Sequence, residues 1–185
     1  LEQPMMVEEC LKTIPSCECA RMEKNALCYP QYTSIVTPLP AEMKQAMTGV
    51  TWNEECPVSL DELRLVRLLH WTENKQVVWG EMIVAKEVTA QTVDAFAELY
   101  QKQFPIHKMK RMVDYNGSDD DSMADNNTSM FNCRKVKGTS RWNEHSYGTA
   151  IDINPLWNPW VKGSKVLPKK AERFVDRNNV IPGMI

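Results

Sequence analysis

The clearest hydrophobic pattern of the chain lies between Thr89 and Phe104. Apolar side chains recur there with the 3.6-residue period of an α-helix, which places them on one face. This apolar stripe consists of Val93, Phe96, Ala97, Tyr100 and Phe104. Thr89 is a suitable N-cap, and Pro105 stops the pattern because proline cannot continue a helix. The pattern predicts a helix over 89–104 whose stripe belongs to the core.

Two apolar runs before this helix predict a β-hairpin. Leu63–Thr72 and Gln76–Ala85 are rich in Leu, Val, Ile and Trp, and Glu73-Asn74-Lys75 separates them. A competing interpretation comes from Ser59-Leu60-Asp61-Glu62, which has the form of a helix capping box. A helix over 60–70 is therefore the alternative to the first strand.

The remaining elements are short. We expect helices around Met6–Thr13, Ala41–Met47 and Lys169–Asn178, strands at Met109–Tyr115 and Gly148–Ile153, and a polar loop at Asn116–Met130. Together they predict an α+β fold, in which helices flank a small antiparallel sheet. Cysteines and prolines crowd the first fifty residues, so we expect an N-terminal extension over 1–50 and a core domain over 51–185.

Composition restricts the function more than the fold. The 185 residues suffice for one domain, and 43% hydrophobic with 25% charged residues is ordinary for a globular protein. A net charge of -2 argues against nucleic-acid binding, and the short basic cluster at 108–111 is expected to be a solvated strand face. No apolar run reaches the ~20 residues that span a bilayer. No signal peptide is evident, so an exported protein would be represented by its mature form.

The six cysteines indicate an oxidising compartment. Cys10, Cys17, Cys19 and Cys28 cluster near the start, whereas Cys56 and Cys133 lie far apart. An even, clustered set favours disulfides over a four-thiolate zinc site, whose usual C-x2-4-C pairs are absent, and over free thiols. We expect Cys133 to be buried near the functional site.

The acidic run Asp119-Asp120-Asp121 invites a calcium interpretation. The alternating acidic positions of an EF-hand loop, with glycine at six and glutamate at twelve, are absent around it. A solvated turn is therefore the favoured interpretation.

The strongest chemical signal lies between Asn143 and Asp152. His145, Gly148 and Asp152 combine an imidazole, a flexible glycine and a carboxylate, and the first and last are zinc ligand types. A turn at Gly148 can bring His145 and Asp152 together, because glycine tolerates unusual backbone angles. Asp152 also stands between two isoleucines, where a carboxylate is costly unless it is paired or bound to metal.

This stretch resembles the D-alanyl-D-alanine carboxypeptidase-like zinc peptidases, which include the vancomycin-resistance carboxypeptidases. Their pattern is Ser-x-His-x-x-Gly-x-Ala-x-Asp, which His145, Gly148, Ala150 and Asp152 match. Asn143 replaces the family serine, and we expect it to brace the site by hydrogen bonding. The flanking segments 126–134 and 154–161 are also similar to one bacterial subgroup, so the resemblance runs from about Trp52 onward.

The resemblance implies a fold, a cofactor and site residues. It implies a D,D-peptidase/hedgehog-like fold, zinc as cofactor, and His145 and Asp152 as its ligands. Arg134 corresponds to the family arginine that stabilises the oxyanion or docks a substrate carboxylate, although it could instead pair with Asp119–Asp121. Arg141 is a weaker candidate. Residues expected to contact substrate are Ser129, Asp120 and Tyr147.

The family also has a third zinc ligand near its C-terminus, a histidine preceded by an acidic base three residues earlier. The sequence ends at Ile185 before such a segment, so we expect an incomplete peptidase core. His70 and His107 match no motif and are expected to be structural or solvent-exposed. The resemblance implies an extracytoplasmic zinc peptidase that cleaves peptidoglycan stem peptides. The alternative is a non-catalytic relative that binds cell-wall peptides or a protein partner.

Overall fold

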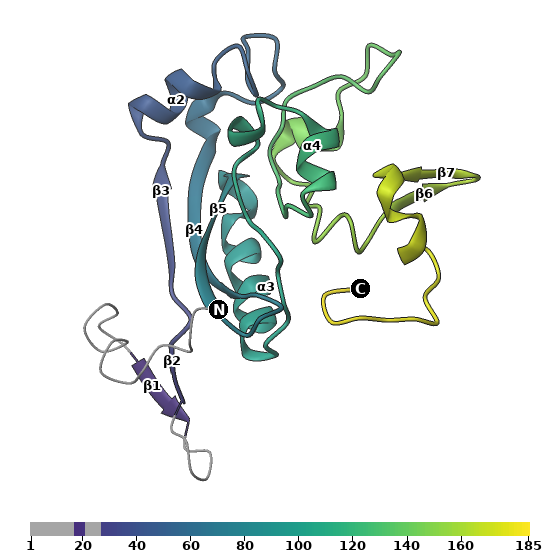
Figure 1. The fold of residues 1–185 in the computed structure, drawn as a ribbon. Coiled ribbons are helices and arrows are strands. Elements are labelled where there is room, and N and C mark those ends of the chain that lie inside the picture. The colour runs from purple at the N-terminus through teal and green to yellow at the C-terminus, as the bar shows by residue number, and fades with distance from the viewer. Residues whose placement is uncertain (1–16, 21–26) are drawn as a thin grey trace.

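The structure of the chain, a computed structural model, describes residues 17–20 and 27–185 (Figure 1). The helix expected around Met6–Thr13 lies outside these residues, as does Cys10. Side chains are described from Pro30 onward, so the pairing of Cys17, Cys19 and Cys28 stays a prediction.

A three-stranded antiparallel sheet forms the centre of the molecule. Its order is β3 (Ser34–Pro38), β4 (Leu63–Trp71) and β5 (Val77–Ala85), and Val66 lies opposite both Val36 and Met82. The predicted hairpin is confirmed. The competing helix over 60–70 is wrong, because the capping box closes only the 3₁₀ helix η1 (Leu60–Glu62) before β4 begins.

Both faces of β4 are buried, which explains its nearly continuous run of apolar residues. Side chains alternate between the faces of a strand. One face packs into a cluster that includes Leu65 and Ile83 with α2 (Ala41–Met47). The other packs Val66 and Met82 against α3 (Thr89–Gln101). The bounds of α2 are those predicted, and both β3 and α2 join this core although they precede residue 50.

Helix α3 confirms the predicted stripe, since Phe96 and Tyr100 are buried and Val93 and Phe104 pack against the same core. The expected N-cap is wrong. Val88 occupies that position, and Thr89 is already helical, with its hydroxyl donating to the Ala85 carbonyl at 3.0 Å.

Two expected strands are absent from the described residues. Met109–Tyr115 instead ends in the 3₁₀ helix η3 (Met112–Tyr115), which buries Met112 and lets Arg111 pair with Asp114 one turn later. Gly148–Ile153 is not a strand either: only Asp152 pairs, with Ser129, in an isolated bridge. Asn154, which has φ 44, then turns the chain away.

The segment expected as a loop, Asn116–Met130, contains the helix α4 (Asp119–Ala124). Its three first-turn aspartates favour this helix, because negative charge is stabilising at the positive end of the helix dipole. The Ser118 hydroxyl caps it by accepting the Asp121 amide. The acidic run is thus a helix start and not a solvated turn.

Smaller elements complete the chain. Strands β1 (Cys17–Ala20) and β2 (Leu27–Pro30) pair near the N-terminus, and β6 (Trp160–Lys162) and β7 (Lys165–Leu167) form a hairpin that the sequence pattern did not indicate. Short 3₁₀ helices are η2 (Lys86–Val88) and η5 (Lys169–Phe174), the latter covering part of the predicted C-terminal helix. Within the described ranges, no helix has the length and apolar character needed to cross a membrane.

Candidate functional site

His145 lies on a short 3₁₀ helix, η4 (Glu144–Tyr147), whose two ends are fixed. The Asn143 side chain caps its start by accepting the His145 amide at 3.0 Å. Asn143 thus braces this segment by hydrogen bonding, as expected for the residue in the serine position. Gly148 ends η4 in the left-handed region, at φ 69.

Glycine is required at position 148 for a second reason. The Gly148 carbonyl accepts the Ala85 amide at 2.9 Å, so the turn lies directly against the end of β5. A Cβ atom at this position would lie 2.9 Å from the Ala85 nitrogen. The close approach and the positive φ therefore exclude a side chain here.

The two expected metal ligands converge. His145 Nε2 lies 3.3 Å from Asp152 Oδ2, with the His145 side chain 15% exposed and that of Asp152 45% exposed. Asp152 is held through its backbone, which exchanges hydrogen bonds of 3.0 and 3.1 Å with Ser129. The convergence inferred from the turn at Gly148 is confirmed.

A backbone carbonyl sets the tautomer of His145. Its Nδ1 lies 2.6 Å from the Met130 carbonyl oxygen, which can only accept, so Nδ1 carries the hydrogen. In the neutral imidazole the lone pair is then on Nε2, which faces Asp152. This arrangement is the one that metal-binding histidines adopt, since a partner on the far nitrogen orients the ring.

The surroundings of His145 stabilise its protonated, positively charged form. Burial lowers the pKa of His145, but the hydrogen bond and charge of Asp152 outweigh it, and the pKa lies above its usual value. A tetrahedral zinc ion with bonds of ~2.0–2.1 Å separates its ligand atoms by about 3.3 Å. The donor types and their separation therefore fit two corners of a zinc site.

The described residues hold no group of three or more His, Cys, Asp or Glu side chains that could share a metal ion. The other two histidines lie elsewhere. His70 is buried in β4, where burial lowers its pKa. His107 is half-buried and pairs with Glu73 at 2.6 Å. His70 is thus in the core, and His107 is partly exposed.

Arg134 lies close enough to His145 for its charge to lower the histidine pKa. Its backbone is tied to η4, because the Arg134 amide donates to the Ser146 hydroxyl at 3.0 Å and that hydroxyl donates to the Arg134 carbonyl at 2.8 Å. Its guanidinium forms an ion pair with Asp119 through Nε. Arg134 thus pairs with one of the three aspartates at 119–121, the alternative given in the sequence analysis, and the ion pair lies beside the candidate site.

The residues expected to contact substrate have different surroundings. Ser129 is 7% exposed, and its backbone supports Asp152. Asp120 is exposed in the first turn of α4, and Tyr147 is 39% exposed on η4. Arg141, the weaker candidate, is also exposed. Their contact with substrate stays a prediction.

Three groups that support the site were not predicted from the sequence. The Met130 carbonyl is a backbone group, so no residue pattern could reveal it. Asn132 is buried and its amide donates to the His145 carbonyl at 3.1 Å, while Ser146 joins η4 to Arg134. Asn132 and Ser146 lie close to the recognised motif in sequence, which is the one signal that could have indicated them.

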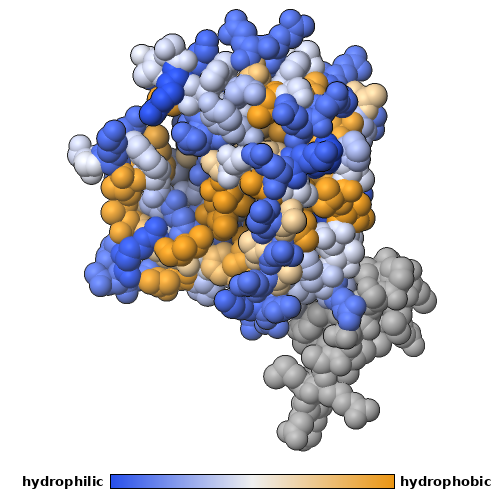
Figure 2. Space-filling view, turned by 180° about the vertical axis from the view of Figure 1, so that it is seen from behind, coloured by the Kyte–Doolittle hydropathy of each residue, from blue (hydrophilic) through white to orange (hydrophobic). Residues whose placement is uncertain are grey.

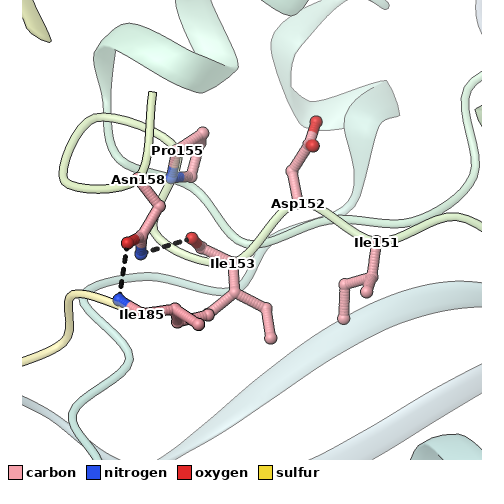
Figure 3. A pocket seen from close by; sticks show the side chains of 6 residues that line it. All are labelled: Ile151, Asp152, Ile153, Pro155, Asn158 and Ile185. Carbon is pink, nitrogen blue, oxygen red and sulfur yellow. Dashed lines mark hydrogen bonds between the residues drawn. The ribbon is translucent and has the colours of Figure 1, made fainter. Parts of the chain in front are cut away.

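A pocket of about 310 Å³ lies behind this pair, on the other side of the segment that carries Asp152. Ile151, Ile153 and Ile185 point into it together, whereas the Asp152 carboxylate points the opposite way (Figure 3). The Asn158 side-chain oxygen accepts a hydrogen bond of 2.7 Å from the Ile185 backbone amide, which holds Ile185 at this pocket. Apolar residues also border a hollow in the surface seen from behind (Figure 2).

Comparison with known proteins gives one family match. Residues 137–182 match the model of the D-alanyl-D-alanine carboxypeptidase family, and the matched part contains His145, Gly148 and Asp152. No curated protein and no solved structure matches the chain. The match is partial, and it confirms the resemblance found in the sequence. Over residues 137–182 the chain is thus similar to the D-alanyl-D-alanine carboxypeptidase family.

Proposed function

We propose that this protein is a zinc metallopeptidase that cleaves peptidoglycan stem peptides in the manner of a D-Ala-D-Ala carboxypeptidase. The observation that carries the proposal is the 3.3 Å approach of His145 Nε2 to Asp152 Oδ2. The family match over residues 137–182 supports it independently.

In this proposal His145 and Asp152 hold the zinc ion. Met130 keeps the His145 lone pair on Nε2, and Ser129 fixes the Asp152 backbone. A bound zinc ion would supply a water of lowered pKa and polarise the peptide carbonyl. The chain's own contribution is to present the two ligand atoms at the correct separation without further rearrangement.

Arg134 is the proposed catalytic residue. Its guanidinium can stabilise negative charge on the attacked carbonyl oxygen or dock a substrate carboxylate. Support for this role comes from its backbone, which exchanges two hydrogen bonds with the Ser146 hydroxyl, next to His145. Ser129, Asp120 and Tyr147 are the proposed substrate contacts.

The family resemblance implies a third zinc ligand, a histidine, and an acidic general base. The described residues bring no third His, Cys, Asp or Glu side chain to the His145–Asp152 pair.

One observation favours a second function, a non-catalytic relative that binds cell-wall peptides or a protein partner. The described residues supply two candidate ligands, whereas catalytic zinc sites usually have three protein ligands. If no further residue completes the zinc site, peptide binding without hydrolysis becomes the better assignment.

An extracytoplasmic location belongs to the same proposal. Cys56 and Cys133 form a disulfide, and such bonds persist in oxidising compartments. A location outside the cytoplasm would also bring the protein to the proposed substrate, the peptide stems of the cell wall.

Zinc quantification tests the proposal. The 185-residue chain is compared with a longer form that carries an Asp/Glu-x-x-His segment after Ile185, termed the full-length protein. Both are assayed for zinc content and for hydrolysis of D-Ala-D-Ala-terminated peptides, each with and without a chelator. We expect stoichiometric zinc and chelator-sensitive hydrolysis in the full-length protein, and weak zinc binding with little or no activity in the shorter chain, since a missing ligand forfeits coordination energy.

Two histidine variants of the full-length protein provide the matched comparison. His145→Ala should remove both zinc and activity, whereas His107→Ala should retain both because His107 pairs with Glu73 elsewhere. Zinc retained in full by His145→Ala would contradict the assigned site. Peptide binding without hydrolysis in the zinc-loaded protein would favour the non-catalytic alternative.

A further inference from the structure

The guanidinium of Arg134 is held by a carboxylate from another element. Asp119, in the first turn of α4, forms the ion pair with Arg134 Nε, and both side chains are about one-third exposed. We infer that Asp119 is a positioning residue, which orients Arg134 toward substrate at the His145–Asp152 site. This inference rests on the proposed function, because it gives Arg134 a task there.

Asp119 is itself fixed on both carboxylate oxygens. Oδ2 meets Arg134, and Oδ1 accepts the side-chain amide of Asn132 at 2.9 Å. The same Asn132 amide donates to the Gly117 carbonyl at 3.1 Å, which holds the start of α4. Asn132 is 3% exposed. Turning its side chain away from Asp119 would leave a buried amide without a partner, which is costly.

Further hydrogen bonds connect Asn132 and Arg134 to the segment that carries His145. The backbone amide of Asn132 donates to the His145 carbonyl, and the backbone of Arg134 exchanges two hydrogen bonds with the Ser146 hydroxyl. Asp119, Arg134 and His145 therefore belong to one hydrogen-bonded unit.

The ion pair between Asp119 and Arg134 occupies only one edge of the guanidinium. The ion pair engages the Nε edge of a planar group that has five donors in a fixed fork. The opposite edge points away from Asp119 and can take a second acceptor. A long, flexible side chain thus has its orientation set before substrate arrives, which lowers the entropy lost on binding.

Asp121 provides a matched control. It lies two residues from Asp119 in the same helix turn, carries the same charge and is exposed. Asp119→Asn removes the ion pair but keeps an oxygen that can accept from Asn132. Asp121→Asn removes one charge from the same helix end without touching Arg134.

The test is a double-mutant cycle in the zinc-loaded full-length protein. Asp119→Asn should lower kcat/KM for a D-Ala-D-Ala-terminated peptide by about 10- to 100-fold, the loss typical of a misplaced catalytic group. Its zinc content should stay that of the wild type, and Asp121→Asn should retain wild-type kcat/KM. In an Arg134→Gln background, Asp119→Asn should have no further effect, because its partner is already absent.

An equal loss in both backgrounds would show that Asp119 acts through the fold, and it would overturn the inference while leaving the proposed function intact. Nitrogen-15 NMR of the Arg134 Nε–H group gives a readout that needs no activity. Its chemical shifts should change in Asp119→Asn, because the neighbouring charge is lost, and should stay those of the wild type in Asp121→Asn. If the wild type hydrolyses no peptide, the proposed function fails, and unchanged shifts in Asp119→Asn would then also overturn the inference.

Discussion

At the scale of single residues, most of the site chemistry depends on atoms that carry no sequence signal. The Met130 carbonyl decides which nitrogen of His145 faces Asp152, and the Ser129 backbone holds Asp152 in place. Methionine and serine at these positions suggest no such task. The ligand types are therefore encoded in the side chains, whereas their orientation is encoded in the backbone.

His70 provides a pH-dependent prediction at this scale. Burial lowers its pKa in the folded protein, although hydrogen bonds to the Trp71 and Ile106 carbonyls and the charge of Glu73 partly oppose that effect. The unfolded chain, with a histidine pKa of ~6.5, then binds the proton more readily. The free energy of unfolding should therefore fall as the pH drops below about 6.5, by at most ~1.4 kcal/mol per pH unit from this residue.

Urea unfolding at several pH values between 7.5 and 5 measures this slope. His70→Gln cannot be protonated in this range, so its free energy of unfolding should decline less steeply than that of the wild type. Identical slopes for wild type and His70→Gln would refute the assignment.

At the scale of elements, the outer edge of β5 organises the site. β5 pairs with β4 on one side only, and on the other side its backbone bonds to three irregular segments. Glu81 donates to Met109, Ile83 accepts from Phe131, and Ala85 donates to Gly148. The edge strand is thus covered, and the segments that lead to Arg134 and His145 are aligned along it.

The contact between Gly148 and β5 gives an element-scale prediction. Gly148→Ala adds a Cβ atom 2.9 Å from the Ala85 nitrogen and places a side chain at positive φ. The left-handed conformation costs about 1–2 kcal/mol, and the crowding should add about 1–3 kcal/mol. The free energy of unfolding should fall by that total, and the zinc affinity of the full-length protein should fall because η4 moves.

Gly163→Ala separates the two effects. Gly163 also has positive φ, at 58, but an added Cβ would meet nothing within 4 Å. Denaturant unfolding should show only the backbone cost for this variant, with zinc affinity retained. Equal losses for the two variants would mean that the contact with Ala85 does not restrict position 148.

At the scale of the whole molecule, a disulfide joins distant parts of the chain. Cys56 and Cys133 are 77 residues apart in sequence, and they link the loop after α2 to the segment between Asn132 and Arg134. Cys133 is buried beside the site residues, as expected from the sequence. The cross-link therefore stabilises the fold and the site together.

Removing this disulfide should be costly. For a closed loop of this length, the loss of unfolded-chain restriction corresponds to about 4 kcal/mol of folding free energy. The double variant Cys56→Ala with Cys133→Ala should show this decrease in denaturant unfolding. A loss that disappears when both proteins are measured under reducing conditions would confirm the origin, whereas a loss that persists there would point to packing at Cys133.

The sequence by itself determined the parts of the protein that depend on local patterns. Periodicity predicted the β4–β5 hairpin and the buried stripe of α3, because alternation and a 3.6-residue repeat directly record which faces are buried. Ligand chemistry and a glycine between the ligands predicted that His145 and Asp152 converge. These features need no knowledge of distant segments.

Only the tertiary structure decided the rest. Gly148–Ile153 was expected to be a strand, but the chain there makes a single bridge to Ser129. Strand pairing depends on which backbone segments lie alongside in the fold, and the composition of the segment does not record this. Helix α4 is stable where a polar loop was expected, and its Asp119 reaches Arg134 across fifteen residues of chain. Long-range hydrogen bonds and ion pairs join residues by their positions in the fold, and such positions leave no periodic signal in a single sequence.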